Sequence, residues 1–133
     1  MSGSGDGDIT PNGARRIYRV LCRLAWCDGE LHPRERGVLD AFRQRYRIDF
    51  GEASQLEAEG QRGENLRIGK RPAERSLLLD SMIDVAAADG QLVAAEQKRL
   101  LDLATATGVG TEELVRRIQQ RLSASGRRLQ PGE

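Results

Sequence analysis

The sequence predicts an all-α fold, with about six helices in one compact bundle. Apolar residues recur at helical spacing along most of the chain, no segment alternates as a strand does, and Gly or Pro interrupts the pattern between helices. At 133 residues the chain is long enough for one domain with a real core. We expect a disordered lead-in at 1–13, a helical domain at 14–123 and a frayed tail at 124–133.

The first predicted unit, residues 14–60, contains three helices. The first runs from Gly13 to Asp28 on a single apolar stripe. Pro33 suits the first turn of the second helix, because a missing N–H costs nothing there. Asp49 has the position of a cap for a third, polar helix that ends near Gly60. The inner face of the second helix carries Val38, Leu39, Phe42 and Tyr46.

The second predicted unit, residues 72–123, follows a Gly-rich, basic connector at 60–72. Pro72 opens a helix that runs to about Ala88. This helix is apolar nearly all round, which predicts a central position in the bundle. A fifth helix ends at Gly108 and a sixth begins near Thr111.

The two units look like copies of one another. Shifting the first by sixty-one residues aligns three helices with three helices. We therefore predict two pseudo-symmetric three-helix units packed face to face, because neither could bury its apolar stripe alone. The matching pairs crowd one corner of each unit: Ala25/Ala86, Asp28/Asp89, Gly29/Gly90, Leu31/Leu92, Glu35/Glu96 and Leu39/Leu100.

That corner reads Asp-Gly-x-Leu-x-x-x-Glu in both copies, and it has a purely structural interpretation. Asp28 and Asp89 fall at the carboxyl ends of helices, where a negative charge costs about 0.3–1 kcal/mol. N–H groups of the turn can offset this cost. Glu35 and Glu96 fall in the first turns of the next helices, where negative charge is favourable. The motif would then be a helix–turn–helix corner used twice.

A functional interpretation stays open beside it. A capping box places Ser or Thr three residues before its Glu, whereas His32 and Val93 occupy those positions here. The spacing matches part of a calcium-binding EF-hand loop but lacks its first two oxygen ligands, so a full EF-hand is excluded. Carboxylates from both corners could still converge on one Ca²⁺ or Mg²⁺ ion. The candidate ligands are Asp28, Glu30, Glu35, Asp89 and Glu96.

At these residues the sequence resembles the TerB-like family, named for bacterial tellurite resistance. The segments that carry the resemblance are "AWCDGELHPRE" and "AAADGQLVAAE", and the similarity covers about residues 14–123. The resemblance implies an all-helical, internally duplicated domain, with acidic residues proposed to bind a divalent metal. It also implies association with stress-response or membrane-linked assemblies. Trp26-Cys27, His32, Val93 and Gln91 depart from the family pattern.

Composition limits the other functions. Lys and Arg number 21 against 20 Asp and Glu, so net charge favours no class of partner. The single histidine and the scattered hydroxyls form no catalytic pattern, so we expect neither an enzyme nor an organic cofactor. We expect a protein partner, without a prediction of oligomeric state. The candidate contacts are Trp26, which could equally belong to the core, and Arg67, Lys70 and Arg71 in the connector.

The alternative partner is nucleic acid, and in that case the acidic turns would have a purely structural role. Arginines cluster in the connector and late in the chain and could meet phosphates, although such residues also solubilise helices. The later group consists of Arg116, Arg117, Arg121, Arg127 and Arg128. The chain shows no secretory signal and no apolar run of about 20 residues, so we expect a cytoplasmic protein without membrane insertion. We expect Cys22 and Cys27 to remain reduced.

Overall fold

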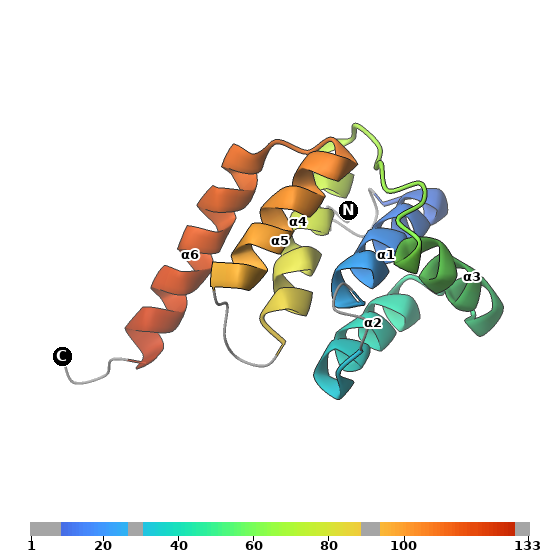
Figure 1. Cartoon of the computed structure of the whole chain (residues 1–133), viewed down its shortest axis with the longest axis horizontal. Coiled ribbons are helices and arrows are strands. Elements are labelled where there is room, and N and C mark those ends of the chain that lie inside the picture. Colours follow the sequence, from blue (N-terminus) through green and yellow to red (C-terminus); the bar gives the residue numbers. More distant parts are fainter. Residues whose placement is uncertain (1–8, 27–30, 89–93, 130–133) are drawn as a thin grey trace, which may run out of the picture.

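The computed structural model describes residues 9–26, 31–88 and 94–129. Within these ranges it contains six α-helices and no strand, which confirms the predicted all-α fold class (Figure 1). The helices are α1 (Pro11–Ala25), α2 (Pro33–Arg45), α3 (Phe50–Gln61), α4 (Pro72–Ala86), α5 (Ala94–Thr107) and α6 (Thr111–Leu129). Helix α1 ends earlier than its apolar stripe suggests, and α6 continues into the segment predicted as a tail.

Local chemistry explains where the helices begin. Three of them start with a proline, namely Pro11, Pro33 and Pro72. The Thr10 side chain accepts the N–H of Gly13 at 2.9 Å, and the Asp49 carboxylate accepts the N–H of Glu52 at 2.8 Å. Helix α1 therefore begins at Pro11, within the segment predicted as a lead-in, and Ile9 packs against the core.

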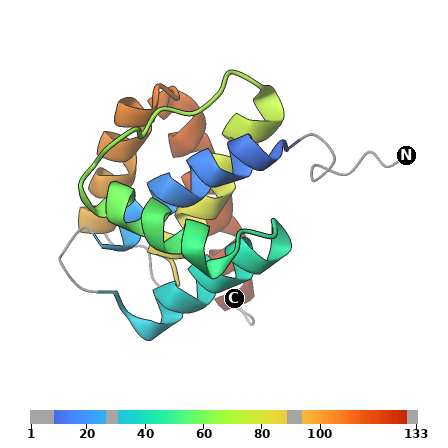
Figure 2. The same cartoon turned by 90° about the vertical axis from the view of Figure 1, so that its right-hand side faces the viewer.

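Helices α1 and α4 form the centre of the bundle. Helix α1 packs against α2, α3, α4 and α5, while α4 packs against α1, α2, α5 and α6. The prediction that α4 is a central helix is confirmed. Figure 2 looks onto the first group of helices, with α3 in front of α1 and α2 below them. The largest fully buried side chains include Ile17, Tyr18 and Leu21 of α1 and Leu78, Met82 and Ile83 of α4.

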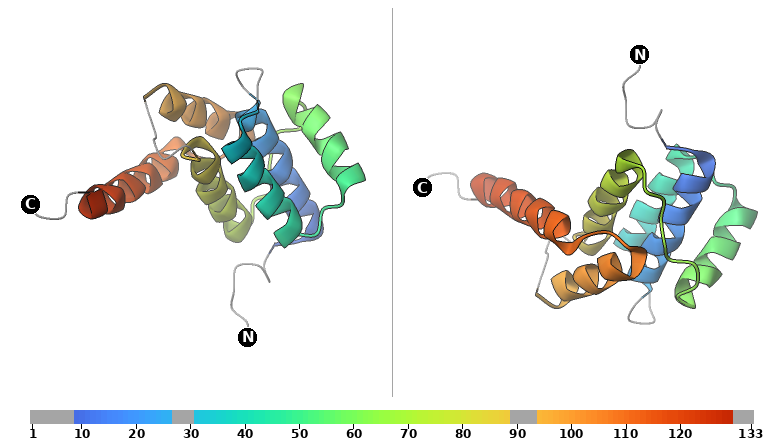
Figure 3. Two further views of the ribbon diagram at one scale, coloured as in Figure 1. Left: turned by 90° about the horizontal axis from the view of Figure 1, so that it is seen from below. Right: turned by 90° about the horizontal axis from the view of Figure 1, so that it is seen from above.

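The two halves match in their first two helices and differ in the third. Helix α2 packs on both α1 and α4, and α5 likewise packs on both α4 and α1. Helix α3 packs along α1, whereas α6 packs on α5 and α4. The carboxyl end of α6 leads away from the other helices (Figure 3). The third helices are therefore not equivalent in their packing.

Helix α3 approaches α1 closely at Gly60. A methyl group on Gly60 would lie 2.5 Å from the carbonyl oxygen of Arg19, so only glycine fits there. Beside this contact the Tyr18 hydroxyl donates to Glu57 at 2.9 Å, and Arg36 donates to both oxygens of the same carboxylate. Burial opposes the charge of Glu57, but these hydrogen bonds outweigh it and hold its pKa below the ordinary value.

The connector between the halves is anchored rather than loose. Leu66 and Ile68 pack against the core. The buried Glu74 carboxylate accepts two hydrogen bonds from Arg16, both at 2.8 Å, and one from the N–H of Gly69 at 2.7 Å. One carboxylate thus ties α4, the connector and α1 together.

Two predictions from the sequence can be checked in part. Cys22 is a buried free thiol, and burial raises its pKa. Cys27 lies outside the described residues. Among the residues that the structure describes, no helix is both long enough and apolar enough to cross a membrane.

Candidate functional site

A cleft of about 390 Å³ lies where the carboxyl ends of α1 and α4 meet the first turns of α2 and α5. Three pairs of residues sixty-one positions apart line it together: Leu24/Val85, Ala25/Ala86 and Glu35/Glu96. The described residues of the two repeated corners therefore line one space rather than opposite ends of the molecule. We call this space the inter-helix cleft.

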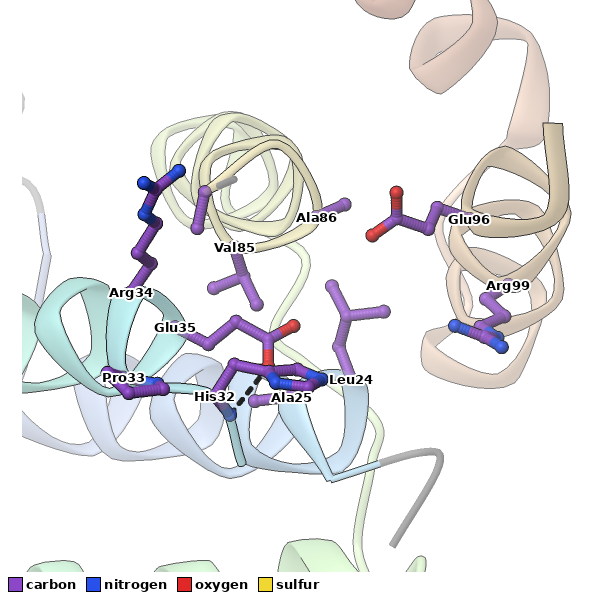
Figure 4. A pocket seen from close by; sticks show the side chains of 11 residues that line it. Leu24, Ala25, His32, Pro33, Arg34, Glu35, Val85, Ala86, Glu96 and Arg99 are labelled. Carbon is purple, nitrogen blue, oxygen red and sulfur yellow. Dashed lines mark hydrogen bonds between the residues drawn. The ribbon is translucent and has the colours of Figure 1, made fainter. Parts of the chain in front are cut away.

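Two of the predicted ligands point into the inter-helix cleft. Figure 4 shows the carboxylate of Glu35 on α2 and that of Glu96 on α5 directed toward the space between these helices. One oxygen of Glu35 accepts the backbone N–H of His32 at 3.2 Å, so this glutamate caps the start of α2. The structural interpretation therefore accounts for one of its oxygens.

The inter-helix cleft is not purely acidic. His32, Arg34 and Arg99 also line it. Arg99 follows Glu96 by three residues on α5, and no hydrogen bond or ion pair joins its guanidinium to any residue of the described ranges. Sequence reasoning did not single out Arg99 as a site residue. The available signal is its helical spacing from Glu96, which places both on one face of α5.

The remaining predicted ligands, Asp28, Glu30 and Asp89, lie outside the described residues. Among the side chains that are described, no group of three or more His, Cys, Asp or Glu residues could hold a metal ion. The donor type of the two glutamates nevertheless fits a hard cation, because Ca²⁺ and Mg²⁺ prefer carboxylate oxygen.

The predicted partner contacts are spread over several places. Trp26 packs against the core while remaining partly exposed, and its indole nitrogen is buried without an acceptor among the described residues. Lys70 lines a separate hollow of about 510 Å³ beside α4 and α6. Arg67 is exposed in the connector, and Arg71 directly precedes α4. Lys70 and Trp26 do not line the inter-helix cleft.

Comparison with known proteins identifies one protein family whose model matches most of the chain. Residues 14–120 match the family model described as tellurite resistance protein TerB. No curated protein and no solved structure matches the chain. The match covers all six helices apart from the start of α1 and the end of α6, including the inter-helix cleft.

Proposed function

The chain belongs to the tellurite resistance protein TerB family, and on this premise we propose that it is a non-enzymatic binding module whose inter-helix cleft holds a divalent cation. The observation that supports the proposal is the placement of Glu35 and Glu96. They come from matching positions of the two halves and line one cleft from opposite sides (Figure 4). A structural turn motif alone does not require its two copies to share a space.

The chemistry of the cleft sets what else the cation needs. Ca²⁺ takes 6–8 oxygen ligands and Mg²⁺ takes six, so two glutamates do not suffice. Asp28, Glu30 and Asp89, the other acidic residues of the two repeated corners, would supply further oxygens, with water completing the shell. Arg99 at the edge of the cleft disfavours a second cation beside the first. The module would therefore take one ion.

For the whole protein we propose the role of an adaptor that docks a partner protein in a bacterial stress-response or membrane-linked assembly. This proposal rests on the family and on the cation. A bound ion would fix both halves relative to one another, and so present one defined surface to a partner.

The nucleic-acid alternative gains no support from the later arginines. Arg117 pairs with Asp80 and Glu113, and Arg121 pairs with Asp84. Arg116 also pairs with Glu113, so the three side chains of this group that the structure describes are matched by carboxylates on α4 and α6. A gel-shift experiment at low salt would reveal nucleic-acid binding as a complex that dissociates steeply as salt rises.

Adding Ca²⁺ or Mg²⁺ is expected to raise the melting temperature of the chain. At an ion concentration one hundred times Kd, the free energy of unfolding rises by about 2.7 kcal/mol. Differential scanning fluorimetry against each ion, after treatment with EDTA, measures the shift. The double variants Asp28→Asn with Asp89→Asn, and Glu35→Gln with Glu96→Gln, should each abolish it.

Glu64→Gln is the matched control, because Glu64 is exposed and pairs with Arg62 away from the cleft. This variant should keep the full ion response. If Glu35→Gln lowers the melting temperature equally with and without ions, and no ion changes the wild type, the carboxylates serve only the turns.

A further inference from the structure

A second, smaller hollow of about 250 Å³ borders the inter-helix cleft. Its apolar lining comes from three elements: Leu24 of α1, Leu66 of the connector, and Leu103 and Ala106 of α5. We call it the apolar hollow. Leu24 and Arg99 line both the apolar hollow and the inter-helix cleft, so the two form adjoining parts of one surface.

The rim of the apolar hollow carries two arginines and one carboxylate, namely Arg23, Arg99 and Asp102. Arg23 donates one hydrogen bond, at 2.8 Å, to the carbonyl oxygen of Gln61, which is neutral. Arg99 has neither a hydrogen bond nor an ion pair within the described ranges, although Glu96 and Asp102 lie one helical turn away on either side. The rim therefore carries two arginines and one carboxylate, and neither arginine forms an ion pair with an acid among the described residues.

The other arginines of α1 differ from Arg23 because each forms an ion pair. Arg15, Arg16 and Arg19 of α1 each meet a carboxylate at 2.7–2.8 Å, on Glu52, Glu74 and Glu59 respectively. Arg23 is the next arginine along α1, and among the described residues it meets only a backbone carbonyl. An internal carboxylate is thus the rule for the arginines of α1, and the exception falls at the apolar hollow.

We propose that the apolar hollow docks a protein partner through one aliphatic side chain preceded or followed by acidic residues. The aliphatic group would displace water from Leu24, Leu66 and Leu103, and the acids would pair with Arg99 and Arg23. Asp102 on the same rim repels an acid, so the partner residue nearest to it is neutral. The inference names the partner surface of the adaptor proposed above, and it does not depend on a bound cation.

The test uses the full chain and a short peptide probe. The probe is acetyl-Gly-Glu-Glu-Leu-Asn-Gly-amide, titrated to millimolar concentration in EDTA and followed by ¹H–¹⁵N correlation spectra. Amide shifts that saturate and cluster at residues 23–24, 66 and 99–106 are the expected result. A probe with serine in place of leucine, and one with lysines in place of the glutamates, should each bind at least about tenfold more weakly.

Two variants sharpen the assignment. Arg99→Gln removes the unpaired charge, and Ala106→Leu fills the hollow from an exposed position. Both variants should fold, and both should lower the affinity for the probe about tenfold. Arg116→Gln is the matched control, since Arg116 lies on α6 and pairs with Glu113. It should leave the affinity unchanged.

Several outcomes would overturn the inference. These are the absence of any saturating shift, shifts confined to other residues, equal binding of the lysine probe, or stronger shifts of the same amides by a short RNA. Probe binding in EDTA together with a failed ion titration would reject only the cation. An ion response without probe binding would reject only the docking surface.

Discussion

Replacing Gly60 by alanine is expected to destabilise the fold by about 2–3 kcal/mol, because the added methyl group has no space. It would lie 2.5 Å from the carbonyl oxygen of Arg19 and 3.1 Å from the backbone nitrogen of Arg23. Backbone atoms cannot swing aside as a flexible side chain can, so α3 must move away from α1. Equilibrium unfolding in urea, read by circular dichroism, measures the loss.

Gly37 provides the matched control for this experiment. It lies inside α2, and a methyl group there would meet no atom within 4 Å. Alanine is the better helix former, so Gly37→Ala should raise the free energy of unfolding by about 0.5–1 kcal/mol. Equal and small effects at both positions would show that α3 does not pack on α1 as described.

Replacing Glu74 by alanine is expected to cost about 3 kcal/mol of stability. The change leaves the Arg16 guanidinium and the N–H of Gly69 without the carboxylate that now receives three hydrogen bonds. Urea unfolding measures this loss too. Glu64→Gln is the comparison, since that carboxylate is exposed and should change the stability little.

The Glu74 site also predicts a dependence on pH. Hydrogen bonds from Arg16, opposed by burial and assisted by the N–H of Gly69, hold the pKa of Glu74 below its ordinary value. A carboxyl group with a lowered pKa stabilises the fold above its unfolded pKa of about 4.3, and this contribution disappears as pH falls through the folded value. Glu74→Gln should therefore lose stability at pH 7 relative to wild type and approach it near pH 3.

If the difference between Glu74→Gln and wild type stays constant from pH 7 to pH 3, the charge of Glu74 does not contribute to stability. The measurement requires urea midpoints at several pH values for both proteins. Other carboxylates, Glu57 among them, also have lowered pKa values and will shift both curves alike. The comparison of the two proteins therefore isolates Glu74.

Much of the fold was predictable because its signals are local. Pro33, Asp49 and Pro72 each act within one helical turn, and the structure starts helices at or directly after these residues. The apolar circumference of α4 correctly predicted its central position. Such signals need no knowledge of which segments meet in space.

The features that the sequence did not reveal depend on long-range contacts. Glu74 reads as an ordinary first-turn acid, and its burial follows from the arrival of Arg16 and Gly69 from other elements. The different packing of α6 likewise depends on partners on α4, such as Asp80 for Arg117. For the candidate site, repetition in the sequence pointed to Glu35 and Glu96. Only the three-dimensional structure showed that Arg99 lines the same cleft.

The contact between α1 and α4 has a consequence for any molecule that occupies the inter-helix cleft. The walls of this cleft belong to both halves of the chain, and the two central helices that carry them are buried against each other. An occupant would therefore contact both halves at once and stabilise their association, and its effect would not be limited to the residues that it contacts. Binding of the occupant would therefore slow amide hydrogen exchange even in α3, which does not line the cleft.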